Sequence, residues 1–145
     1  MTHQNYFLPI GYPLASAVFS MIAAQLFKCT YFLFRDRKIC FPAWFSSGGM
    51  PSAHSAMVSG LTTAIALSYG ISSVYFSIAF VLSTIVLYDS AGVRQIAGNL
   101  AITLNRVLDQ SQSPVRKVKE VKGHTLLEVC VGVIIGMGVA FGLSR

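Results

Sequence analysis

One stretch of 33 residues, from Ala56 to Tyr88, contains no charged side chain. As a single helix it would be about 50 Å long at 1.5 Å per residue, whereas the hydrocarbon core of a bilayer is about 30 Å thick. The chain must therefore turn back within the stretch, and the sequence "YGISS" at residues 69–73 is typical of a tight turn. We predict two membrane spans here, at about residues 51–69 and 72–93.

The rest of the chain has the same membrane character. Only 11% of the residues are charged and 54% are hydrophobic, whereas soluble domains carry roughly 25% charged residues. Apolar runs at residues 8–34 and 126–144 are each long enough to cross a bilayer. We therefore expect one all-α domain over residues 1–145, a multi-pass helical membrane protein with about four transmembrane helices.

Basic residues fall almost entirely on one side of this predicted protein. With four spans, residues 35–54 and 94–124 lie on one side of the membrane, and both termini lie on the other. Ten of the 11 Lys and Arg residues are on the first side, and only Arg145 is opposite. By the positive-inside rule, the first side faces the cytoplasm.

An amphipathic helix is predicted between the third and fourth spans. Apolar residues recur there at helical spacing beside polar and basic ones, which is typical of a helix that lies in the membrane interface. The basic sequence "VRKVKEVKGH" follows it and would be attracted to anionic lipid, although positive charge here also serves to determine topology. The apolar residues are Ile96, Leu100, Leu104 and Val107.

Glycines recur along the fourth span in two overlapping small-xxx-small patterns, which suit close contact between helices. We expect them to serve packing rather than chemistry, within the chain or between two copies in a homodimer. They are Gly132, Gly136, Gly138 and Gly142.

The segment "SSGGMPSAHSA" at residues 46–56 has two interpretations. In the structural one, Gly48 and Gly49 allow a sharp turn, Pro51 begins a helix and a serine caps it. In the functional one, the free backbone amides at a helix start bind phosphate. His54 would then give or take a proton beside the phosphate.

Other polar residues on the same side favour a site. Two cations lie at the end of the first span, and a third lies at the end of the third span. A histidine begins the fourth span, and an acid follows it four residues later on the same helical face. Each has a structural alternative: snorkelling cations, an ion pair between Asp89 and Arg94, or an acid that stabilises a helix start. The set is Lys28, Arg35, Asp89, Arg94, His124 and Glu128.

Three short motifs resemble the signatures of the type 2 phosphatidic acid phosphatase (PAP2) superfamily. The stretches "GGMPSAHSA", "YDSAGVR" and "GHTLLEV" resemble more closely its divergent PAP2 branch, a family of small bacterial and plastid membrane proteins. The resemblance covers about residues 25 to 140 and implies a phosphatase of the bacterial inner (plasma) membrane with a cytoplasmic active face. The signatures are K-x6-R at Lys28 to Arg35, "PSAH" at Pro51 to His54, and a histidine followed by an acid at His124 to Glu128.

The chain departs from the superfamily pattern in four features. The most consequential is the loss of the serine-arginine pair six residues before the last histidine, because Val118 occupies the place of the arginine and another cation must then contact the phosphate. Arg94, Lys117 and Lys119 are the candidates, and we favour Arg94 because it ends a span at the membrane edge. The other departures are Asp36 for a proline, Ala53 for the glycine of PSGH and Glu128 for the final aspartate.

The resemblance also implies a role for each residue. His124 would be the nucleophile that forms a phosphohistidine, Glu128 would orient its ring, and His54 would protonate the leaving alkoxide and later activate water. Asp89 would support the site. No cofactor or metal is required, although Asp89 and Glu128 offer oxygen ligands suited to Mg²⁺. The phosphoryl oxygens would be held by Lys28, Arg35, Ser52, Arg94 and the amides around Gly49 and Ala53.

The expected substrate is a lipid phosphomonoester of the cytoplasmic leaflet, with phosphatidylglycerol phosphate ranked slightly above phosphatidic acid. Undecaprenyl pyrophosphate, a common substrate of the superfamily, would be expected on the opposite face of the membrane. The predicted topology therefore argues against it as the substrate. The expected partners are therefore a phospholipid and the membrane, and no nucleic acid. One alternative is a non-catalytic protein that binds lipid phosphate or assists assembly, which needs the cations but not both histidines. Another is a purely structural four-span protein, in which the histidines affect only stability.

Overall fold

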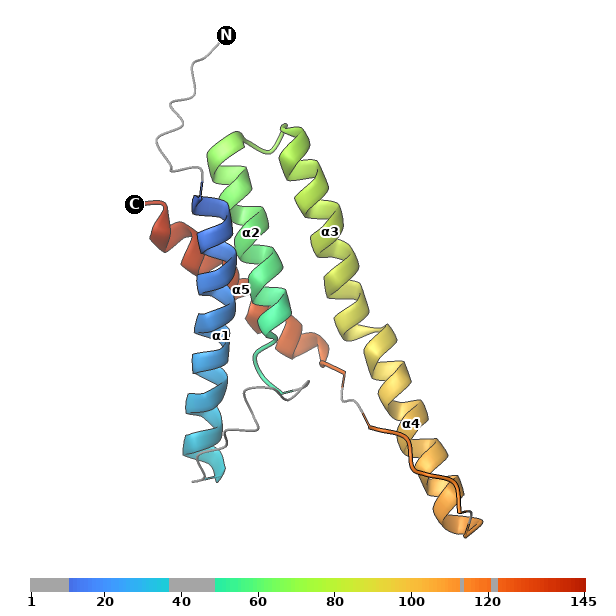
Figure 1. The fold of residues 1–145 in the computed structure, drawn as a ribbon. Coiled ribbons are helices and arrows are strands. Elements are labelled where there is room, and N and C mark those ends of the chain that lie inside the picture. The colour runs from blue at the N-terminus through green and yellow to red at the C-terminus, as the bar shows by residue number, and fades with distance from the viewer. Residues whose placement is uncertain (1–10, 37–48, 113, 121–122) are drawn as a thin grey trace.

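The computed structural model describes residues 11–36, 49–112, 114–120 and 123–145. This part of the chain is helical and contains no strand, which confirms the predicted all-α fold (Figure 1). Its helices are α1 (Tyr12–Asp36), α2 (Ala53–Tyr69), α3 (Val74–Ala91), α4 (Val93–Gln110) and α5 (Leu126–Leu143).

Three helical stretches in the described residues are long and apolar enough to cross a membrane. They are Tyr12–Tyr31 in α1, Val74–Gln110 in α3 and α4, and Leu126–Leu143 in α5. The predicted second span, α2, is not among these three; it has 17 residues and packs against α1, α3 and α5. The protein is thus an integral membrane protein, and the predicted count of about four spans is approximate.

The tight turn predicted between α2 and α3 is confirmed. Gly70 follows α2 with a φ of 80°, a conformation that favours glycine. Ser73 then caps α3, because its hydroxyl accepts a hydrogen bond from the Phe76 amide at 3.1 Å. The turn lies at the same end of the molecule as the start of α1 (Figure 1).

Two predicted helix ends, both given as approximate, differ from the observed ends by two residues. The second span was expected to begin at Pro51, but Ser52 is the N-cap and α2 begins at Ala53, so Pro51 precedes the helix. The third span was expected to reach Val93, but α3 ends at Ala91 because Gly92 leaves helical geometry with φ −110° and ψ −82°.

The bundle of α1, α2 and α5 is packed through small residues, as expected for helices in a membrane. A Cβ atom at Gly132 would meet the carbonyl oxygen of Ser52, and one at Gly136 would overlap the carbonyl oxygen of Ala56. Large apolar side chains lie mostly outside. The buried residues on the facing surfaces are Ser16, Ser20 and Ala24 of α1, Ser55, Ala56, Ser59 and Gly60 of α2, and Gly132, Gly136 and Ala140 of α5.

Helix α4 continues α3 in nearly the same direction and leads away from the bundle (Figure 1). Residues 114–120 and 123–124, the return segment, run back along α4 toward the bundle (Figure 1). The amphipathic helix predicted here is present. Its large apolar side chains are exposed, with Ile96 at 69% and Leu100 at 67%, whereas its buried residues are Gly98, Ala101 and Asn105.

Candidate functional site

The predicted histidine and acid at the start of α5 form a pair. Nδ1 of His124 lies 3.0 Å from Oε2 of Glu128, and the two side chains are only 9% and 17% exposed. They meet because His124 lies just before the helix and Glu128 lies in its first turn. In the tautomer with the proton on Nδ1, His124 donates a hydrogen bond from Nδ1 to the Glu128 carboxylate. Nε2 is then the imidazole nitrogen with a free electron pair.

Glu128 is fixed by the cap of α5 as well as by His124. Its Oε2 accepts a hydrogen bond from the Thr125 amide at 3.1 Å, and its own amide donates to the Thr125 hydroxyl at 3.4 Å. This capping box confirms the structural reading of the acid, and the same carboxylate also holds the histidine. The Glu128 carbonyl accepts the Ser52 amide at 3.1 Å, which joins the starts of α5 and α2.

Lys28 of α1 is buried beside this pair. It is only 3% exposed, and its ammonium interacts electrostatically with Glu128. Lysine is rarely buried so completely unless an opposite charge is near. The snorkelling expected of a cation at the end of a span is therefore not what Lys28 does, because its side chain is directed into the protein.

His54 lies in the first turn of α2 and is exposed. Two positive or ionisable groups, Arg94 and His124, act on it electrostatically. The structure therefore brings the two histidines of the sequence motifs into one group, although 70 positions separate them in the chain (124 minus 54).

Arg94 is the second residue of α4 and pairs with Asp89 near the end of α3. Its Nε lies 2.7 Å from Oδ2 of Asp89, with side chains 46% and 38% exposed. The ion pair that we gave as the structural alternative is thus present. Nε is one of five guanidinium N–H donors, so the pair leaves other donors on Arg94.

The other candidates for the missing arginine lie along the outer part of the return segment. Lys117 is paired with Asp109 at 2.7 Å. Asp109 is 15 residues beyond Arg94, or about 22 Å along α4. Lys119 is exposed. Of the three cations, Arg94 is the one with an electrostatic interaction with His54.

The start of α2 confirms the serine cap of the structural interpretation of its sequence. The fully buried Ser52 hydroxyl accepts hydrogen bonds from the amide and hydroxyl of Ser55, at 3.3 and 2.8 Å, so this side chain is the helix cap. Among the described residues, the amides of Ala53 and His54 have no acceptor. Gly49 has a φ of 89°, which favours glycine. Contact of these groups with phosphate stays a prediction.

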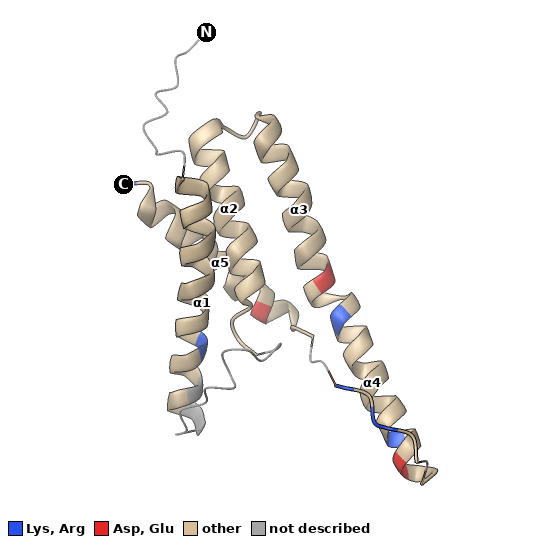
Figure 2. Cartoon of the chain, viewed as in Figure 1, with Lys and Arg blue, Asp and Glu red and all other residues tan. Residues whose placement is uncertain are grey.

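Part of the predicted site lies outside the described residues. Arg35 is in the last turn of α1, but its side chain is not described, and residues 46–48 are not described either. Figure 2 shows that the described charges gather at one end of the bundle and along α4. That distribution agrees with the asymmetry seen in the sequence.

Sequence reasoning missed two residues that hold His124 in place. The His124 amide donates to the Ser90 carbonyl at 3.2 Å, and Ser90 is 3% exposed. Gly123 packs so closely on α4 that a Cβ atom there would overlap the backbone of Gln95. The glycine before His124 was a visible signal of close backbone approach, whereas a backbone carbonyl leaves no signal in the sequence.

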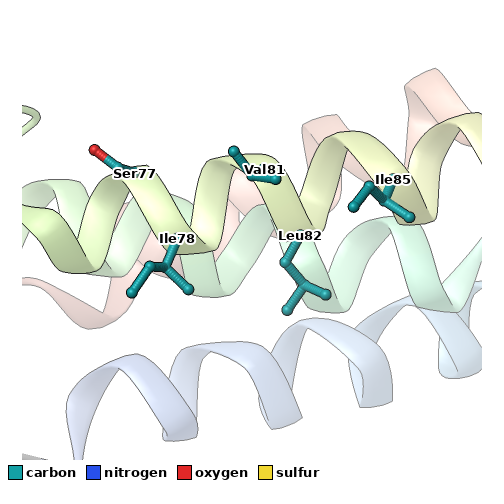
Figure 3. A pocket seen from close by; sticks show the side chains of 5 residues that line it. All are labelled: Ser77, Ile78, Val81, Leu82 and Ile85. Atoms are coloured by element: carbon teal, nitrogen blue, oxygen red, sulfur yellow. The ribbon is translucent and has the colours of Figure 1, made fainter.

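A shallow apolar groove along α3 is separate from these residues. Ser77, Ile78, Val81, Leu82 and Ile85 line it, and Ile78 and Leu82 point to the same side of the helix (Figure 3). Such a surface suits contact with lipid chains, as expected for a helix with most of its apolar side chains exposed.

Comparison with known proteins agrees with the motifs. The model of the Divergent PAP2 family matches residues 11–139. The protein named "Uncharacterized membrane protein YuiD" from Bacillus subtilis (strain 168) is 33% identical over an alignment of 142 positions. The match covers 88% of this chain and 90% of that protein. No solved structure matches this chain.

Proposed function

Because the chain belongs to the divergent PAP2 family, we propose that it is a phosphoric monoester hydrolase that removes phosphate from a phospholipid. Phosphatidylglycerol phosphate is the first candidate substrate and phosphatidic acid the second. The observation that carries the proposal is the contact of 3.0 Å between His124 and Glu128. Glu128 also interacts electrostatically with the buried Lys28, and His124 with His54. Phosphoryl transfer needs these types of group.

In the first step, Nε2 of His124 attacks the phosphorus atom and the bond from phosphorus to the lipid oxygen breaks. Glu128 holds Nδ1 and stabilises the positive charge that the imidazole gains. His54 donates a proton to the lipid alkoxide, which leaves as an alcohol. The product of this step is a phosphohistidine at position 124.

In the second step, His54 is a base and takes a proton from water. The resulting hydroxide attacks the phosphohistidine, the P–N bond breaks, and inorganic phosphate leaves with His124 restored. Lys28, Arg35 and Arg94 would neutralise the phosphoryl oxygens in both steps, with the amides of Ala53 and His54 as further donors. The electrostatic interaction of the buried Lys28 with Glu128 supports this assignment, because Glu128 contacts the proposed nucleophile His124.

The excess of cations on one side supports a cytoplasmic active face in the bacterial inner membrane. Phosphate lipids that are made in that leaflet would reach the site without crossing the membrane. The alternative is a non-catalytic protein that binds lipid phosphate with the same cations. It would need neither the proton transfer by His54 nor the nucleophile His124.

The test is phosphate release by the purified protein in detergent, from each of the two lipids, with EDTA and separately with Mg²⁺. The wild type is compared with His124→Ala, His54→Ala and the matched control His124→Gln, which keeps polarity but cannot form a phosphohistidine. We expect release by the wild type in EDTA and a loss of at least about 10²-fold in each variant.

Three results would contradict parts of this proposal. Equal release by all proteins would exclude the histidine mechanism. Release that requires Mg²⁺ would exclude a metal-independent reaction. Binding of lipid phosphate by the wild type without release from either lipid would favour the binding protein.

We also propose a homodimer through the exposed part of α5. Gly132 and Gly136 are already covered by α2, but a Cβ atom at Gly138 or Gly142 would meet nothing within 4 Å. These two glycines retain the spacing of a helix contact motif. Crosslinking between cysteines introduced at position 138 in native membranes should give dimers, and absence of crosslinks there would contradict a dimer through this face.

A further inference from the structure

Asn105 of α4 uses its whole side-chain amide to hold the return segment. Oδ1 accepts a hydrogen bond from the Val118 amide at 2.8 Å, and Nδ2 donates to the Val118 carbonyl at 2.9 Å. Nδ2 also donates to Oε1 of Glu120 at 2.9 Å. Because Val118 needs both an acceptor and a donor, only one orientation of the amide satisfies it.

This contact is buried although it lies on an arm of the molecule. Asn105 is 6% exposed, whereas the large apolar side chains of α4 are mostly exposed. With Gly98 and Ala101 it forms the face of α4 that is buried. A buried amide that loses its partners costs free energy, so the segment is held on this face rather than resting loosely against it.

The described part of the return segment resumes at Gly123, immediately before His124. Beyond Glu120, it contacts α4 again where Gly123 lies against Gln95, and then α3, where the His124 amide donates to the Ser90 carbonyl. The position of the His124 backbone is thus determined by α3 and α4, whereas its ring is held by Glu128 of α5.

We propose that Asn105 is a positioning residue for His124. It lies 10 residues along α4 from Gln95, or about 15 Å, and acts by holding the return segment so that Nε2 of His124 faces the phosphoryl group. The inference rests on the proposed phosphatase function for its effect on catalysis. Its structural part, the placement of His124 by Asn105, does not.

The chemistry of the contact predicts a series of variants. Asn105→Ala removes all three hydrogen bonds. Asn105→Asp keeps an acceptor for the Val118 amide but sets a carboxylate against Glu120 and against the Val118 carbonyl. Adding Glu120→Gln to Asn105→Asp supplies a donor at position 120 and removes the repulsion between the two carboxylates. Asn99→Ala is the matched control, because Asn99 is an exposed asparagine on the same helix.

The first readout is steady-state phosphate release by the full chain in detergent. We expect kcat to fall by about 10²-fold in Asn105→Ala, because a displacement of the nucleophile by about 1 Å lowers the rate by about that factor. KM should change little, since Lys28 and Arg94 are not displaced. Asn99→Ala should match the wild type, and Glu120→Gln should restore part of the kcat lost in Asn105→Asp.

The second readout is amide hydrogen exchange of Val118 and His124, with helix content by circular dichroism to confirm folding. Exchange should be faster in Asn105→Ala and unchanged in Asn99→Ala. Unchanged exchange in Asn105→Ala would overturn the inference, and so would faster exchange with wild-type kcat. If the wild type releases no phosphate but exchange is faster in Asn105→Ala, the phosphatase proposal fails while the placement of His124 by Asn105 is supported.

Discussion

The two parts of the molecule that meet at His124 are built in opposite ways. The bundle of α1, α2 and α5 is packed through glycine, alanine and serine, and it buries Lys28 at 3% exposure. The arm of α3, α4 and the return segment exposes most of its large apolar side chains. Within the arm, α3 packs on α2, whereas the return segment is held on α4 by polar contacts, chiefly those of Asn105. Close packing restricts the movement of helices in the bundle, whereas individual hydrogen bonds determine the position of the return segment on α4.

This difference indicates how the site is assembled. Glu128, Lys28 and the start of α2 belong to the bundle, and Arg94 belongs to the arm. His124 is attached to both, through Glu128 on one side and Ser90 on the other. Changes in the bundle should therefore affect folding, whereas changes in the arm should affect catalysis with little loss of stability.

The largest expected effect on the free energy of unfolding distinguishes Lys28 of the bundle from Lys117 of the return segment. Lys28→Ala removes a buried side chain whose ammonium interacts electrostatically with Glu128, and the cavity that it leaves should lower the free energy of unfolding by about 2–5 kcal/mol. Lys117→Ala removes one partner of an exposed ion pair and should leave stability nearly unchanged. Reversible unfolding in mixed micelles measures both variants. Equal losses would show that the bundle and the arm do not differ in this way.

A smaller effect is expected from two glycines of α5. Gly136→Ala places a methyl group against the Ala56 carbonyl and the Ser59 hydroxyl, and overpacking of this kind costs about 1–3 kcal/mol. Gly138→Ala, measured at a protein-to-detergent ratio that keeps the chain monomeric, is the control, because a methyl group there meets nothing within 4 Å in the same chain. The same unfolding measurement applies, and a stable Gly136→Ala protein would mean that α2 and α5 are not closely packed.

The smallest effect on stability is expected at the junction of α3 and α4. Asp89→Asn removes the charge of a partly exposed ion pair, which contributes less than about 1 kcal/mol. If Arg94 binds phosphate, Arg94→Ala should instead raise KM for the lipid while the unfolding midpoint stays close to that of the wild type. A large loss of stability in Asp89→Asn would show that this ion pair holds the arm in place.

The order of helices was predictable because it follows from local properties. A charge-free stretch longer than a bilayer must turn back, and glycine and serine at residues 69–73 show where. The helix ends at Ser52 and Gly92 were less predictable. Capping depends on a few dihedral angles, and several residues near each end offer equivalent signals.

The sequence by itself determined which chemical groups are present and that most of the charges collect at one end of the helices (Figure 2). The charge count, the "PSAH" motif and the spacing from His124 to Glu128 are properties of the chain alone. The contact at 3.0 Å between the last two depends in addition on the cap of α5, because His124 precedes the helix.

Only the tertiary structure decided which of these groups interact. The burial of Lys28 opposite Glu128, the hydrogen bond from the Ser52 amide to the Glu128 carbonyl, and the contact of Asn105 with Val118 all join segments that are separated in the chain. The physical reason is that hydrogen bonds and charge pairs act over a few ångströms. Their partners are therefore set by how the helices pack, which no local pattern specifies.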